Sequence, residues 1–109
     1  MIDAGRGKII FTSSVLGFRG GTNVAGYTAT KTALVGLTKA LANEWAPLGV
    51  NVNAIAPRII DTPANREMMP KADSGKWVPP ERIAVAMCFL CSDAAASING
   101  ARLAIYGAV

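Results

Sequence analysis

The architecture of this chain follows from the stretch Lys8-Ile9-Ile10-Phe11-Thr12-Ser13-Ser14, a near-continuous run of β-favouring residues. A strand that is apolar along most of its length is typical of a parallel sheet with both faces covered by helices. Residues 8–14 are therefore predicted to form such a strand. The run closes on two serines, which places hydroxyl groups at the carboxyl end of the strand.

Strand-like and helix-like segments alternate along the rest of the chain, which predicts an α/β fold with a parallel sheet. The expected elements are a strand at 8–14, a loop at 15–23, a helix at 24–46, a strand at 50–56, an irregular stretch at 58–78, a helix at 80–92 and a strand at 102–106. The irregular stretch is expected to face the substrate. Pro80 at a first helical position and Asn99-Gly100 at a turn support these boundaries.

The expected helix at 24–46 carries an apolar stripe and an N-cap. The stripe consists of Leu34, Leu37, Leu41 and Trp45, which recur at helical spacing. Asn23 is the predicted N-cap, because its side chain can accept a hydrogen bond from the first free amides. The stripe is interpreted as ordinary core in preference to a purely intersubunit surface, although both roles are compatible.

Length and composition limit the classes of function. The chain has 109 residues, 51% hydrophobic and 17% charged, which suits one small domain with a buried core. Its net charge of +4 comes from scattered Lys and Arg without a basic run, so no nucleic-acid partner is expected. The sequence contains no signal peptide and no apolar run of transmembrane length, so we expect no membrane partner and a cytoplasmic location.

Metal and thiol chemistry are also disfavoured. The chain has no histidine and no cluster of carboxylates, so neither a metal site nor a Ser-His-Asp hydrolase is expected. Cys88 and Cys91 have the spacing of a redox Cys-x-x-Cys motif, but Phe89 and Leu90 between them indicate an apolar helix. We therefore predict that the two cysteines pack in a buried segment.

Ser14, Tyr27 and Lys31 form the most informative chemical pattern. Residues four apart on a helix lie on one face, so the Lys31 ammonium can lie close to the Tyr27 phenol. A nearby cation favours the phenolate, which suits Tyr27 to move a proton on or off a substrate oxygen while a hydride moves at carbon. Ser14 can hydrogen-bond the same oxygen. Taken alone, the Tyr27 and Lys31 pair is more typical of an ordinary surface pair than of an active site.

Further motifs surround these three residues along nearly the whole chain. They are Gly7-Lys8-Ile9-Ile10, Gly17, Leu37, Ala40-Leu41, Glu44, Val50-Asn51-Val52-Asn53-Ala54-Ile55-Ala56-Pro57, Pro79-Pro80-Glu81, Phe89-Leu90-Cys91-Ser92-Asp93 and Asn99-Gly100. Together the set resembles the short-chain dehydrogenase/reductase family. The resemblance implies an oxidoreductase that transfers a hydride between a nicotinamide cofactor and a secondary alcohol or ketone.

The resemblance implies roles for individual residues. Tyr27 resembles the general acid/base, and Lys31 the residue that favours its phenolate and holds the nicotinamide ribose. Ser14 resembles the residue that orients the substrate carbonyl, with Ser13 as the alternative if the register slips by one. These assignments make Ser14, Tyr27 and Lys31 the expected catalytic residues.

The segment 57–62 resembles the family's Pro-Gly-x-x-x-Thr motif, which meets the nicotinamide end of the cofactor. The resemblance implies contacts from Ile60 and Thr62. The resemblance further implies that these two residues, together with Tyr27, Lys31 and Pro57, form a binding site for NAD or NADP.

The resemblance also implies that the chain is the C-terminal half of a doubly wound parallel Rossmann-like sheet, ordered strand-helix-strand-helix-strand. Residues 1–109 would then be a partial NAD(P)-binding domain, because Gly5-Arg6-Gly7 precedes a strand and cannot serve as the glycine-rich turn that binds pyrophosphate. Met1 is accordingly expected to be an internal methionine of a longer protein. The alternative function is a truncated, non-catalytic remnant that interacts with full-length relatives through the helix at 24–46.

Three segments indicate the substrate class. Asn43-Glu44-Trp45-Ala46, Phe18-Arg19-Gly20-Gly21 and Gly75-Lys76-Trp77 resemble sugar-acid dehydrogenases acting on gluconate or deoxygluconate compounds. We therefore expect a small-molecule alcohol or ketone substrate that is a sugar acid. The full-length form is expected to be a homo-oligomer.

The chain also departs from the family pattern. Arg58 replaces the usual glycine after Pro57, and Tyr106 with Ala108 replaces a common Asp-Gly-Gly near the end. Candidate ligands for a substrate carboxylate are Arg19, Arg58 and Arg66.

Overall fold

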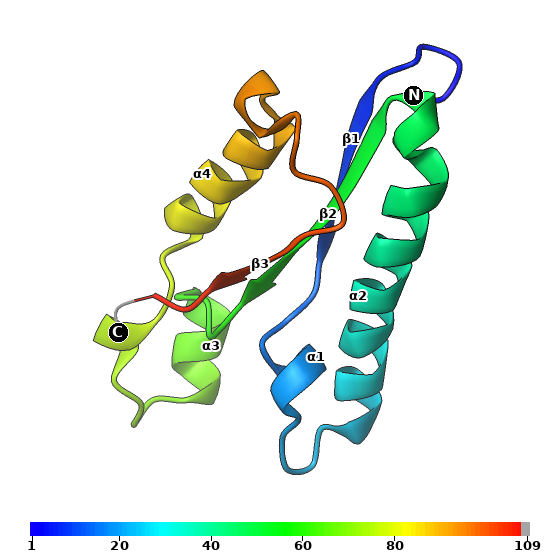
Figure 1. Cartoon of the computed structure of the whole chain (residues 1–109). Helices are drawn as coiled ribbons and strands as arrows, with labels where there is room; N and C mark the ends of the chain where they lie inside the picture. The colour runs from blue at the N-terminus through cyan, green and yellow to red at the C-terminus, as the bar shows by residue number, and fades with distance from the viewer. Residues whose placement is uncertain (108–109) are drawn as a thin grey trace.

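The computed structural model describes residues 1–107 and consists of a parallel sheet between helices, as Figure 1 shows. The strands are β1 (Gly7–Thr12), β2 (Val50–Pro57) and β3 (Arg102–Ile105), and they pair in parallel in the order β1-β2-β3. The two long helices are α2 (Ala25–Trp45) and α4 (Pro80–Cys91). The predicted α/β fold with a parallel sheet is confirmed. Ala108 lies outside the described residues.

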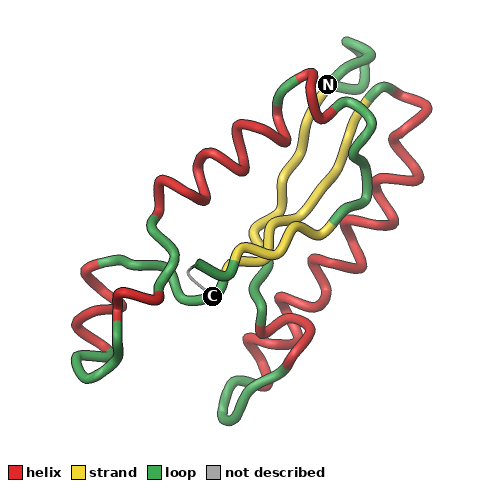
Figure 2. The backbone as a smooth tube through the Cα atoms, turned by 60° about the vertical axis from the view of Figure 1, so that its left-hand side comes forward, coloured by secondary structure: helices red, strands yellow, loops and turns green. Residues whose placement is uncertain are grey.

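Helices α2 and α4 cover opposite faces of the sheet, with the strands visible between them in Figure 2. On the α2 side, Ala42 packs with Val50 and Val52 of β2. On the α4 side, Ile83 and Leu90 pack with Ile55 of β2. Strand β2 is thus buried on both faces, as a continuous apolar run in a parallel sheet requires.

The remaining elements are short. They are α1 (Leu16–Arg19), η1 (Ala46–Leu48), α3 (Pro63–Met68), η2 (Ser74–Lys76) and η3 (Asp93–Ala95). Helix α1 lies within the segment expected to be a loop, and α3 within the stretch expected to be irregular. Strand β1 ends two residues earlier than predicted, so both serines follow the strand and do not belong to it.

One expectation about α2 was wrong, and another holds in part. Asn23 does not cap the helix; it has φ 61°, in the left-handed region, and Val24 occupies the N-cap position without a side-chain hydrogen bond. Leu41 and Trp45 of the predicted stripe pack against the core, whereas Leu37 is 42% exposed. The residues buried deepest on α2 are Thr38 and Ala42. The small side chains meet the sheet because they allow the helix axis to approach it closely.

The expectation that the cysteines are buried was also wrong. Cys88 and Cys91 are both exposed and unbonded. Helix α4 is apolar on more than one face, and it meets the sheet through Ile83 and Leu90. Apolar composition alone therefore did not identify the buried face.

Candidate active site

A cleft of about 840 Å³ lies where β1 and β2 end. The carboxyl ends of parallel strands meet at one edge of the sheet, so the loops that follow them come together there. The cleft is lined by Ser14, Val15, Leu16, Arg19, Gly20, Val24, Tyr27, Arg58, Ile59, Ile60, Asn65, Met68 and Met69. These residues come from the segment with α1, the start of α2, and the segment with α3.

Ser14 is held firmly at the base of this cleft. Its side chain is nearly buried, and its Oγ accepts a hydrogen bond of 3.2 Å from the Leu16 N–H. The next residue, Val15, donates its N–H to the Pro57 carbonyl at 3.0 Å. The main chain around Ser14 is therefore fixed to the end of β2, and the hydroxyl proton of Ser14 remains available to an oxygen in the cleft.

Ser13 occupies a different environment from its neighbour. Its Oγ donates a 2.7 Å hydrogen bond to the Lys31 carbonyl, and its own N–H donates to the Ile55 carbonyl at 2.8 Å. The side chain is buried and is absent from the cleft lining given above. Of the two serines, Ser14 is the one that lines the cleft.

Tyr27 and Lys31 lie one turn apart at the start of α2. Tyr27 is 47% exposed and lines the cleft. The Lys31 Nζ lies 5.6 Å from the centroid of the Tyr27 ring and donates a 3.0 Å hydrogen bond to the Thr12 carbonyl at the end of β1. This bond holds the ammonium group beside the tyrosine instead of leaving it free in solvent.

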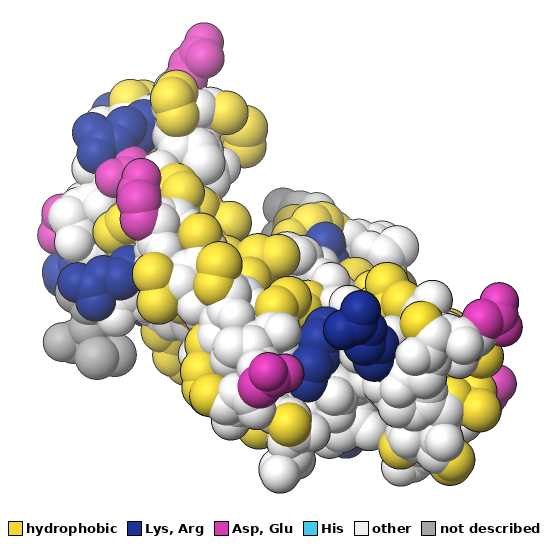
Figure 3. All heavy atoms as spheres, turned by 90° about the horizontal axis from the view of Figure 1, so that it is seen from above, with side chains coloured by type: hydrophobic (Ala, Val, Ile, Leu, Met, Phe, Trp, Pro, Cys, Tyr) yellow, Lys and Arg dark blue, Asp and Glu magenta, His cyan; other side chains and the backbone are white. Residues whose placement is uncertain are grey.

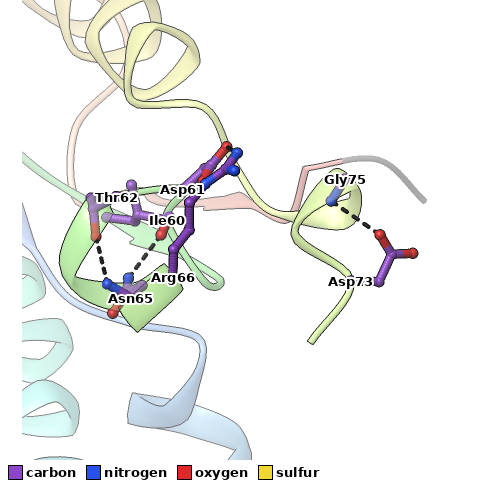
Figure 4. Close-up of polar contacts among 7 residues, drawn as sticks. All are labelled: Ile60, Asp61, Thr62, Asn65, Arg66, Asp73 and Gly75. Atoms are coloured by element: carbon purple, nitrogen blue, oxygen red, sulfur yellow. Dashed lines mark hydrogen bonds and ion pairs between the residues drawn. The ribbon is translucent and has the colours of Figure 1, made fainter. Parts of the chain in front are cut away.

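The segment after β2 is organised by a small hydrogen-bond network, shown in Figure 4. Thr62 is the N-cap of α3, and its Oγ1 accepts from the Asn65 N–H at 3.2 Å. The Asn65 side-chain amide donates to the Ile60 carbonyl at 2.7 Å. Ile60 therefore has a fixed place in the cleft wall, whereas Pro57 and Thr62 support this wall without lining it.

Arg66 is engaged by Asp61 and does not line the cleft. Its Nε and a terminal nitrogen donate to the two Asp61 carboxylate oxygens at 2.6 and 2.8 Å. The hydrogen bond from Arg66 holds the pKa of the Asp61 carboxyl below its usual value, and the same bond raises the pKa of Arg66. Of the three candidate arginines, Arg19 and Arg58 line the cleft.

Met68 and Met69 line the cleft from within the stretch that was expected to face the substrate, whereas the helix α3 and its cleft residue Asn65 were not predicted from the sequence. The sequence signal for α3 was present, because Thr62 followed by Pro63 is a favourable N-cap and first position of a helix.

On the face seen in Figure 3, Lys, Arg, Asp and Glu side chains are interspersed among apolar ones. No helix within residues 1–107 is both long and apolar enough to cross a membrane.

The chain is similar to known proteins along almost its entire length. Residues 1–107 match the family model described as Enoyl-(Acyl carrier protein) reductase. A 2-dehydro-3-deoxy-D-gluconate 5-dehydrogenase from Pseudoalteromonas atlantica is 46% identical over 117 residues, which cover 98% of this chain and 46% of the relative. This chain belongs to the short-chain dehydrogenase/reductase family.

Solved structures agree with this assignment. A protein from Beutenbergia cavernae assigned as an NAD(P)-dependent gluconate 5-dehydrogenase, solved with NADP at low occupancy, matches with a TM-score of 0.87 and 41% identity over 95% of this chain and 46% of that chain. A protein from Agrobacterium tumefaciens assigned as a 2-deoxy-D-gluconate 3-dehydrogenase, solved with NADP, matches with a TM-score of 0.84 and 42% identity over 97% of this chain and 48% of that chain. The chain spans about half the length of the curated relatives it matches.

Proposed function

We propose that this chain carries the catalytic residues of an oxidoreductase that transfers a hydride between NAD or NADP and the secondary alcohol or ketone of a sugar acid. The observation that carries the proposal is that Ser14 and Tyr27 line one cleft while Lys31 is anchored beside Tyr27. The relatives named above, which act on deoxygluconate or gluconate compounds by their names, support the substrate class.

In the proposed mechanism, each residue acts on the oxygen of the substrate. The Tyr27 hydroxyl gives its proton to the oxygen when a ketone is reduced and takes it back when an alcohol is oxidised. The Lys31 ammonium stabilises the phenolate formed in the first case. Ser14 donates a hydrogen bond to the same oxygen and orients it, since its hydroxyl accepts from the Leu16 N–H and its own proton remains free.

The residues present fit the nicotinamide end of a dinucleotide. The Lys31 ammonium is held at the end of β1 and beside Tyr27, which lines the same cleft as Ile60. A bound cofactor would supply or accept the hydride. Tyr27, Lys31, Pro57, Ile60 and Thr62 are the residues proposed to hold it, with Pro57 and Thr62 acting through the wall they support.

The cellular location and the assembly of the full-length form are also part of the proposal. We propose a cytoplasmic location and a homo-oligomeric full-length form. The two free cysteines of the described chain are compatible with a reducing compartment.

The test is Tyr27→Phe, which removes the hydroxyl and keeps the ring. We expect turnover of D-gluconate with NAD or NADP, followed by nicotinamide absorbance, to fall roughly 100- to 10,000-fold. The matched control is Tyr106→Phe, because the other tyrosine lines a separate cavity. Equal rates for the wild-type chain and Tyr27→Phe would contradict the proposal, as would a wild-type chain that neither binds nor reduces the cofactor.

A further inference from the structure

The cleft carries positive charge without an acidic partner. Its lining contains two arginines, Arg19 and Arg58, and no aspartate or glutamate. Within residues 1–107 the ion pairs are those of Arg66 with Asp61 and of Lys76 with Asp73, so neither cleft arginine is neutralised by a described carboxylate. The cleft is therefore electrostatically suited to an anion.

The backbone fixes where Arg58 enters the cleft. Its N–H donates a 2.9 Å hydrogen bond to the Ile105 carbonyl, which continues the pairing of β2 with β3. The carbonyl of Pro57 accepts from Val15, so Arg58 begins directly beside the segment that holds Ser14. Its φ is not positive, so an arginine occupies this position without backbone strain.

Arg58 borders an apolar wall formed by its neighbours. Ile59, Ile60, Met68 and Met69 line the same cleft. Arg58 itself is exposed, so its planar guanidinium is free to bind a carboxylate through two parallel hydrogen bonds. The apolar wall leaves room for the body of a ligand between this charge and the hydroxyls of Ser14 and Tyr27.

We propose that Arg58 binds the carboxylate of the substrate and so determines specificity for hydroxy- or keto-carboxylic acids over neutral alcohols. The assignment rests on the proposed function, because it concerns the same cleft. Arg58 holds the carboxylate end, while the reacting carbon lies at Tyr27 and Ser14. Arg66 does not line the cleft, and its Nε and one terminal nitrogen already donate to Asp61.

Binding tests the proposal without turnover. The 109-residue chain is labelled with ¹⁵N, and amide shifts at Ser14, Val15 and Ile60 are followed as D-gluconate or its neutral amide is added. Arg58→Gln should raise the Kd for D-gluconate roughly tenfold or more and leave the Kd for the amide within about twofold. The Kd of Arg58→Lys for D-gluconate should lie between those of the wild-type chain and Arg58→Gln, because lysine keeps the charge but not the bidentate geometry.

The control is Arg82→Gln, which removes one positive charge from the exposed surface of α4, outside this cleft. It should leave both Kd values within about twofold, as screening of exposed charges predicts. The proposal is overturned if Arg58→Gln changes neither Kd or raises the Kd for both ligands equally. It is also overturned if Arg19→Gln raises the Kd for D-gluconate while Arg58→Gln does not, or if D-gluconate shifts no cleft amide of the wild-type chain.

The two proposals fail separately. If Tyr27→Phe keeps full turnover while Arg58→Gln weakens gluconate binding, the catalytic assignment is wrong and the binding assignment stands. If Tyr27→Phe is inactive while Arg58→Gln binds gluconate as tightly as the wild-type chain, the binding assignment alone is wrong.

Discussion

Ser13 and Ser14 have the same chemistry and different surroundings. The Ser13 hydroxyl is buried and donates to the Lys31 carbonyl of α2, which joins the end of β1 to that helix. The Ser14 hydroxyl accepts from Leu16 and lines the cleft. One position along the chain thus separates a contact that supports the fold from a group able to meet a substrate.

Alanine at each serine should separate these roles. Ser13→Ala removes a buried hydrogen bond and should lower the free energy of unfolding by about 1 kcal/mol, measured by urea titration. Ser14→Ala should lower turnover roughly 100-fold, because it removes a donor to the substrate oxygen, with a smaller effect on unfolding. The reverse pattern, with turnover lost only in Ser13→Ala, would assign the substrate contact to Ser13.

The Asp61 and Arg66 pair predicts a titration. Because the hydrogen bond from Arg66 lowers the folded-state pKa of Asp61 below its ordinary 3.8, the pair stabilises the fold above that value. This stabilisation is lost as the pH falls through the folded-state pKa. In Arg66→Gln the Asp61 carboxyl should titrate closer to 3.8, as followed by the NMR shift of its carboxyl carbon. An unchanged midpoint would show that the ion pair does not persist in solution.

At the scale of elements, the wall of the cleft depends on how closely α1 packs against α2. A Cβ at Gly17 of α1 would lie 2.9 Å from the main-chain carbon of Lys31 and 3.0 Å from the Ser13 Oγ. These distances are shorter than ordinary contacts, and two of the three atoms that a Cβ would meet are main chain. The position therefore requires glycine because of proximity and not because of φ.

Gly17→Ala should force α1 away from α2. We expect a loss of about 1–3 kcal/mol in unfolding free energy together with weaker D-gluconate binding, because α1 carries Leu16 and Arg19 of the cleft. The matched control is Gly36→Ala within α2, where a Cβ would meet no atom within 4 Å. That variant should gain about 0.5–1 kcal/mol from helix propensity. Equal stability of the two variants would contradict the close packing.

The sequence predicted the long elements and missed the short ones for physical reasons. The three strands and the two long helices carry apolar patterns that extend over several residues, and these patterns do not depend on tertiary contacts. Helices α1 and α3 have four and six residues, too few for periodicity to be read. On α2 the predicted stripe identified Leu41 and Trp45, which pack against the core. It did not include Thr38 and Ala42, because they are buried by the closeness of the sheet, which hydrophobicity does not report.

The candidate site was predictable where it depends on local spacing. Tyr27 and Lys31 are one helical turn apart, so their proximity follows from α2 alone. The pairing of Arg66 with Asp61 and the access of Arg58 to the cleft depend on how the segment after β2 folds back. Those features required the structure.

At the scale of the whole molecule, asparagine side chains join the sheet, helix α2 and the turn before β3. Asn99 accepts from the Val52 N–H of β2 at 2.8 Å and donates to the Ala42 carbonyl of α2 at 2.9 Å. Asn53, almost fully buried in β2, donates to the Ile98 carbonyl at 2.8 Å and accepts from the Ala101 N–H at 2.9 Å. The turn before β3 is therefore held to both the sheet and a helix by side-chain amides.

Asn99→Ala should weaken the whole fold, because it leaves a buried Val52 N–H and the Ala42 carbonyl without their side-chain partner. We expect a loss of about 2–4 kcal/mol in the free energy of unfolding, measured by urea titration followed by circular dichroism, and faster hydrogen exchange at the Val52 amide. The matched control is Asn43→Ala on the exposed face of α2, which should change stability by no more than about 0.5 kcal/mol. If Asn99→Ala and Asn43→Ala unfold alike, the layers are held by apolar packing alone, and the turn before β3 adds nothing to their cohesion.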